Sequence, residues 1–293
     1  MIKYLIKRIF RRDKSKHKER VVRVIPKSLS ELSLYSLAVF VFSALLLQFL
    51  ITAQTALLLR FFSISFSYSL FGLSFSWVSA EAWPEERIFL VYGFGMLVYF
   101  GLGFFLLYIL KKSKRLHWKQ RLFYTWMAFL MIHTLPLGML SGIFFFDGFG
   151  KAYFWLFDTL FVRASLTVLV LPFVFIQRSF WVSLFLKAAN SASYFSNTEQ
   201  RQLLIKYIFV RPWFIGVSLL LLIVVSRFSW AWFIFLIGLG LIVLPIFGNR
   251  ISKRKYSILK FDKEIFRYPN PRTRFAIIFL LLWLANFFVK INF

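Results

Sequence analysis

One ionisable side chain, His133, lies in the middle of a long apolar run, within the segment HTLPLGMLSG. Imidazole can transfer protons or bind a metal ion near neutral pH, and an ionisable residue inside a membrane segment is a candidate for function by default. The alternative is a neutral histidine that is hydrogen-bonded across a helix interface. His17 and His117 lie in hydrophilic segments, so we expect no second imidazole beside His133.

Pro136 follows His133 by three positions and should kink a helix or free one of its carbonyl groups. A stripe of small residues shares this segment, namely Thr134, Gly138, Ser141 and Gly142. Two small residues four positions apart are typical of closely packed membrane helices. We therefore expect this stripe to pack against another helix, and a substrate path is the alternative.

Charges alternate in sign over seventeen residues after this segment, in the order Asp147, Lys151, Asp158 and Arg163. Charged groups near a lipid interface persist best when they are paired. The sequence therefore suggests an ion pair between Arg163 and either Asp158 or Asp147 at the outer rim of the protein. Anchoring of the chain at the interface, without such a pair, is the alternative.

Several kinds of chemistry find no support in the sequence. The chain has no Cys, which excludes disulfides and thiolate ligands. Its acidic residues all lie in tails, in loops or at the ends of apolar runs, so the usual carboxylate relay for protons or cations is missing. Zinc-protease, nucleophile-elbow, P-loop and dinucleotide motifs are also missing. We predict no catalytic residue, no metal site and no cofactor.

The amino-acid composition indicates that the elements carrying these residues lie in a membrane. The 293 residues are 60% hydrophobic, well above the share of a soluble domain. Apolar stretches of about twenty residues recur, which is the length that a helix needs to cross a bilayer. About 30 polar and basic residues precede the first apolar stretch. That stretch is itself too long for the apolar region of a cleavable signal peptide. The sequence predicts an all-α, polytopic membrane protein.

We place seven transmembrane helices along the chain. The seventh is short, and a re-entrant segment is the alternative for it. Residues 1–30 form a basic tail, and residues 31–293 form a single transmembrane domain. The predicted spans are about 32–59, 88–110, 122–146, 159–186, 207–226, 228–247 and 275–289.

The distribution of positive charge predicts the orientation. The formal net charge is +26, and 30 of the 37 Lys and Arg fall in the stretches 1–30, 111–121, 187–211 and 248–274. Each stretch flanks an apolar span, which is the positive-inside pattern of a cytoplasmic (inner) membrane protein with a cytoplasmic N-terminus. The same distribution argues against a nucleic-acid partner.

The basic tail has an amphipathic start. Ile2, Leu5, Ile6 and Ile9 share one helical face, and basic residues occupy the others. This pattern is typical of a helix that lies on anionic lipid headgroups at the cytoplasmic surface. A helix that binds a partner protein and a solvated tail are the alternatives.

The first external loop contains an alternating pattern. Between Ser63 and Ser79, small polar residues alternate with apolar ones on both sides of Phe71 and Gly72. Period two around a central glycine predicts a short β-hairpin with its turn at this pair. An extended loop is the alternative.

Three functions remain compatible with the sequence. The sequence has no acidic residue inside an apolar run and no catalytic motif. This absence favours a non-catalytic subunit or assembly component of a membrane complex, with other membrane proteins as partners. The first alternative is a transporter or flippase for a lipid or small anionic solute, with His133 and Arg163 along its path. The second is a membrane-embedded enzyme that modifies lipids, with His133 as its general base.

Overall fold

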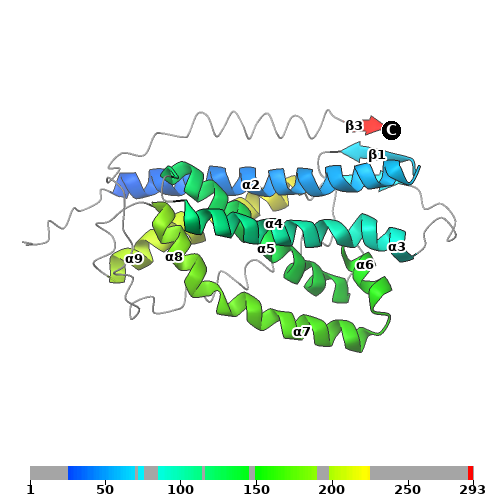
Figure 1. Cartoon of the computed structure of the whole chain (residues 1–293). Coiled ribbons are helices and arrows are strands. Elements are labelled where there is room, and N and C mark those ends of the chain that lie inside the picture. Colours follow the sequence, from blue (N-terminus) through cyan, green and yellow to red (C-terminus); the bar gives the residue numbers. More distant parts are fainter. Residues whose placement is uncertain are drawn as a thin grey trace, which may run out of the picture.

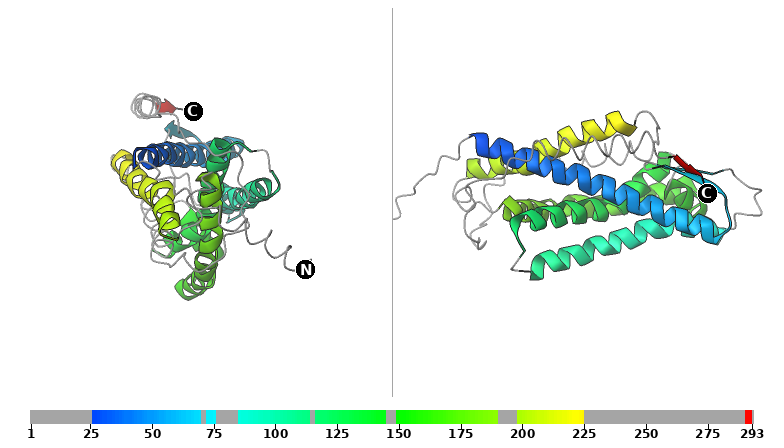
Figure 2. Two further views of the ribbon diagram at one scale, coloured as in Figure 1. Left: turned by 90° about the vertical axis from the view of Figure 1, so that its left-hand side faces the viewer. Right: turned by 90° about the horizontal axis from the view of Figure 1, so that it is seen from above.

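A computed structural model of the chain describes residues 26–69, 72–75, 85–113, 116–144, 149–189, 198–224 and 290–292. These residues are mainly helical, and most helices run side by side in one bundle (Figures 1 and 2). The helices are α2 (Pro26–Phe61), α3 (Glu85–Ile88), α4 (Gly95–Lys112), α5 (Trp118–Phe144), α6 (Phe149–Leu156), α7 (Leu160–Ile176), α8 (Arg178–Ala189), α9 (Thr198–Ile205) and α10 (Arg211–Val224). Two π-helical segments, η2 (Phe89–Phe94) and η4 (Lys206–Val210), continue directly into α4 and α10.

Helix α2 has a well-defined beginning and end. Pro26 is its first residue, a position where proline is favoured because its missing N–H would have no helical partner. At the other end Ser63 adopts a left-handed φ of 57°, and its N–H bonds the Arg60 carbonyl at 3.0 Å. The N–H of Ile64 bonds the Leu59 carbonyl at 2.9 Å, which completes a Schellman turn with both side chains buried.

Helix α5 lies at the centre of the bundle and contacts α2, α4, α6, α7 and α8. Its contact with α4 is close because Gly103 of α4 has no side chain. A Cβ atom at that position would lie 2.6 Å from Cγ1 of Ile132 on α5 and 3.0 Å from its backbone nitrogen. Most of the surface of α5 is covered by the rest of the described chain.

The predicted fourth span, 159–186, is not one continuous helix. It is divided at Gln177 into α7 and α8, and the carbonyl of Gln177 accepts hydrogen bonds from the N–H groups of Phe180 and Trp181, each at 3.0 Å. The segment before it, expected as an outer loop, contains helix α6. The chain bends by 115° between α6 and α7, which makes the pair either a broken span or a re-entrant loop.

A small antiparallel sheet follows α2. Strands β1 (Phe66–Ser69) and β2 (Gly72–Phe75) pair with Phe66 opposite Phe75 and Ser69 opposite Gly72, so residues 70–71 connect them. Gly72 thus lies in a strand and not in the turn, one position away from our expectation. The third strand, β3 (Lys290–Asn292), pairs antiparallel with β1, and no sequence pattern suggested it.

Four helical segments in the described part of the chain are long and apolar enough to cross a membrane, or five if the bent α6–α7 pair counts as one. They are Leu29–Phe61, Glu86–Lys112, Trp118–Ile143 and Gln200–Leu221. The first three predicted spans and the fifth correspond to them. The predicted spans 228–247 and 275–289 and the amphipathic start of the tail lie outside the described residues.

The two ends of the bundle differ in charge. Helix α4 ends with Lys111 and Lys112, α5 carries Lys119 and Arg121 in its first turn, and α8 has Lys187 in its last turn. We call this the basic end. The strands, α3 and α6 lie at the opposite end, which we call the far end (Figure 1).

Candidate functional site

His133 lies inside the bundle on α5, with 1% of its surface exposed. Its Nδ1 lies 2.6 Å from the Phe129 carbonyl oxygen one turn earlier. Because a carbonyl group can only accept, Nδ1 carries the proton of the neutral ring. Nε2 is then a buried acceptor, and within the described part of the chain it has no hydrogen-bond partner. The imidazole is held by its own helix, not by the cross-helix hydrogen bond that we considered.

Aromatic rings surround this histidine. Its ring centroid lies 4.5 Å from that of Phe129 and 5.6 Å from that of Trp181 on α8. Phe129 and Trp181 are themselves 5.2 Å apart, in an edge-to-face arrangement that aromatic pairs favour. Phe129 and Trp181 thus give the His133 imidazole an apolar environment on two sides.

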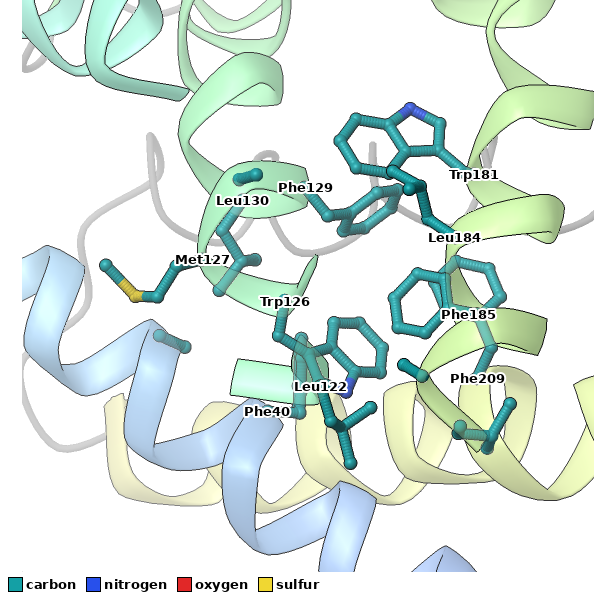
Figure 3. Packing of buried hydrophobic residues seen from close by; sticks show 14 of the residues in the cluster. Phe40, Leu122, Trp126, Met127, Phe129, Leu130, Trp181, Leu184, Phe185 and Phe209 are labelled. Carbon is teal, nitrogen blue, oxygen red and sulfur yellow. The ribbon is translucent and has the colours of Figure 1, made fainter. Parts of the chain in front are cut away.

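The rings belong to a larger core that joins four elements (Figure 3). Trp126 of α5 lies 4.6 Å from Phe185 of α8, 5.3 Å from Phe209 of η4 and 4.7 Å from Phe40 of α2, measured between ring centroids. All four side chains are fully buried. Together with Phe129 and Trp181 they form what we call the aromatic core.

A hydrogen-bonded chain fixes this core from one side. The indole N–H of Trp126 donates to the Ser36 hydroxyl at 2.9 Å, and that hydroxyl donates to the Ile208 carbonyl at 2.5 Å. Ile208 lies in η4, where the π-helical pattern changes the usual pairing of carbonyl groups. One serine therefore connects α2, α5 and η4. Our reading of the sequence missed it, because nothing in the spacing distinguishes Ser36 from other serines.

The small-residue stripe on α5 packs against α6, as expected for helix packing. A Cβ atom on Gly138 would lie 3.1 Å from Cδ1 of Phe149, and one on Gly142 would lie 2.9 Å from Cδ1 of Tyr153. The hydroxyls of Thr134 and Ser141 bond carbonyls of their own helix. Pro136 lies within α5 and is buried between His133 and this contact.

Arg163 is buried where α7 begins, with 7% of its surface exposed. Its Nη1 donates to the Gly142 carbonyl at 3.3 Å, and its guanidinium carbon lies 4.4 Å from the ring centroid of Phe154. Its own carbonyl accepts from the Tyr153 hydroxyl at 2.7 Å and from the Thr167 hydroxyl at 2.9 Å. These contacts hold α6 and α7 to the end of α5. The Nε of Arg163 is buried, and none of the residues that the structure describes bonds it.

The residues of the expected charge cluster have different surroundings. Asp158 is exposed, and no ion pair links it to Arg163 in the part of the chain that the structure describes. Lys151 donates to the Tyr92 hydroxyl at 3.3 Å and lies over the same ring. Asp147 lies outside the described residues, so its pairing stays a prediction.

The structure does not bring His133 and Arg163 together. Arg163 bonds the carbonyl of Gly142, which is nine residues beyond His133 on α5 and so roughly 13 Å further along the helix axis. Nor do the described residues contain a group of three His, Asp or Glu side chains that would hold a metal ion.

Comparison with known proteins gives no further guide to the site. No protein-family model matches the chain, and no curated protein or solved structure is significantly similar to it.

Proposed function

We propose that this chain is an integral protein of the cytoplasmic membrane and acts as a non-catalytic subunit or assembly component of a membrane complex. The single observation that carries this is the burial of His133. The one candidate for chemistry inside the apolar run has 1% of its surface exposed and packs against the aromatic core. Its environment is that of a structural side chain.

The two alternative functions would need a different environment around His133. A transporter or flippase requires a polar path to this residue, but Phe129 and Trp181 cover the ring. A lipid-modifying enzyme requires a second group that orients or protonates the imidazole, whereas no described residue bonds the Nε2 of His133.

For the topology we propose seven spans, with the basic end in the cytoplasm and the far end outside. The density of cations at the basic end supports this orientation. The basic N-terminal tail would then lie on anionic headgroups of the cytoplasmic leaflet, and the β1–β2 strands would rest at the outer surface.

Helix α7 offers the surface that a partner would contact. Phe161 is 80% exposed and Leu169 is 73% exposed, although both belong to an apolar helix that leaves the centre of the bundle. In a bilayer this face meets either lipid chains or a neighbouring helix. A complex in the membrane would cover it.

A photo-crosslinking amino acid at Phe161 or Leu169 tests this function in native membranes. We expect one discrete protein adduct from each position, and we expect the same protein to travel with the tagged chain in mild detergent at constant stoichiometry. Phe129, which is fully buried, is the matched position that should give no adduct. A chain that purifies alone and gives no adduct at either α7 position would exclude a subunit role.

A further inference from the structure

Arg121 of α5 and Lys187 of α8 are two cations at the basic end of helices that contact each other. These helices are antiparallel, because Trp126 pairs with Phe185 whereas the later residue Phe129 pairs with the earlier residue Trp181. Arg121 lies five residues from Trp126 toward the basic end, and Lys187 lies two residues from Phe185 in the same direction. At 1.5 Å per residue they are about 7 and 3 Å beyond that contact, so they lie near the same level.

Arg121 is poorly satisfied in this position. Its Nη2 makes one long hydrogen bond, 3.5 Å, to the Ser113 carbonyl. Its Nε is buried and has no hydrogen-bond partner among the described residues. A buried guanidinium group normally has its donors occupied, because an unmade bond to a charged group costs more than one to a neutral group.

Lys187 feels both burial and its neighbour. Desolvation lowers the pKa of its ammonium group, and the positive charge of Arg121 lowers it further. Like charges at close range repel, and the repulsion grows as water is excluded. In the described residues, neither cation forms an ion pair with a carboxylate. The site therefore has an excess of positive charge and unused donors.

The surroundings match the headgroup level of a bilayer. Trp118 is buried beside the site, and the Lys119 ammonium lies 5.9 Å from the ring centroids of both Trp118 and Tyr35. On α4 the Lys112 ammonium lies 4.7 Å from the Tyr108 ring. Cations and amphipathic aromatic rings at the ends of apolar helices mark the membrane–water interface.

We propose that Arg121 and Lys187 together bind a phosphate group at the basic end of the bundle. A guanidinium fork matches the oxygens of a phosphate, and an ammonium group adds a second charge without a fixed direction. The phosphate of an anionic phospholipid headgroup and free inorganic phosphate share this chemistry. Its negative charge would offset the repulsion between the two cations.

Native mass spectrometry of the full chain in detergent, titrated with phosphatidylglycerol or with phosphatidylcholine, tests this site. We expect Arg121→Gln and Lys187→Gln each to weaken phosphatidylglycerol binding roughly tenfold, since each removes one charge-assisted bond. Arg121→Lys should lose less. Lys112→Gln is the matched control, because it removes one exposed cation from the same end and should change binding less than about twofold.

The source of the phosphate is decided by competition. Displacement of the lipid by excess inorganic phosphate, in the wild type but not in Arg121→Gln, would identify free phosphate as a ligand of the same site. Equal weakening of lipid binding by all variants, Lys112→Gln included, would show only diffuse electrostatic attraction and would overturn the site. Unchanged binding in both Arg121→Gln and Lys187→Gln would overturn it as well. If Arg121→Gln does not fold, Lys187→Gln decides. The measurement uses the chain alone, so its outcome is separate from whether a protein partner exists.

Discussion

At the scale of single residues, burial shows that a side chain able to do chemistry can have a structural role. The type of His133 suggested proton transfer, but its protonated nitrogen bonds its own helix and its ring belongs to the aromatic core. We predict that His133→Phe changes the free energy of unfolding by less than about 1 kcal/mol, because the ring contacts remain and an unpaired buried nitrogen is removed.

The comparison variant is His133→Ala, which loses those contacts and should cost about 2–4 kcal/mol. Thermal unfolding in detergent, followed by tryptophan fluorescence, measures both. A folded His133→Phe protein that no longer assembles with its partner in the membrane would give the imidazole a functional role after all.

Ser63 is a residue whose backbone, and not its side chain, determines its importance. Its φ of 57° is favourable for glycine and unfavourable for other residues. Ser63→Gly should therefore stabilise the protein by about 1 kcal/mol and raise its unfolding midpoint. Ser65→Gly, at a neighbouring exposed position without a positive φ, should give no gain. Equal effects of the two substitutions would contradict the assigned helix end.

At the scale of elements, apolar length predicted four of the long helices because hydrocarbon thickness constrains it directly. Our reading of the sequence missed the break at Gln177, although the polar pair Gln177 and Arg178 interrupts the apolar run there. The alternation in residues 66–75 indicated strands, but the pairing of β3 with β1 depends on residues more than two hundred positions apart. The Ser36 connection was hidden because its partners, Trp126 and Ile208, lie 90 and 172 positions away along the chain.

Two glycines of α4 offer a direct test of its packing on α5. Gly103 faces Ile132 at a distance that leaves no room for a Cβ atom, whereas a Cβ atom on Gly101 would meet nothing within 4 Å. Gly103→Ala should destabilise the bundle by about 1–3 kcal/mol through overpacking. Gly101→Ala should be neutral or stabilising by about 0.5 kcal/mol, because alanine favours a helix. Unfolding midpoints in detergent give both values, and a reversed order would show that α4 presents its other face to α5.

At the scale of the whole molecule, two arginines lie toward the two ends of α5. Arg121 near its start and Arg163 against its end each have a buried Nε that no described residue bonds. Between them lies the aromatic core, which contains the side chains most completely removed from solvent. This order of charge, apolar interior and charge is the one that a bilayer imposes on a protein that crosses it.

The orientation of the bundle in the membrane can be tested with single cysteine substitutions, because the chain has no cysteine of its own. Positive charge is retained in the cytoplasm, so the connector after α4 should lie inside and the α6–α7 bend should lie outside. A membrane-impermeant maleimide should label Asp158→Cys in right-side-out vesicles and label Ser113→Cys only after permeabilisation. Ala128→Cys, fully buried on α5, should stay unlabelled under both conditions. Labelling of Ser113→Cys but not of Asp158→Cys in sealed vesicles would invert the proposed topology and move the phosphate site to the outer leaflet.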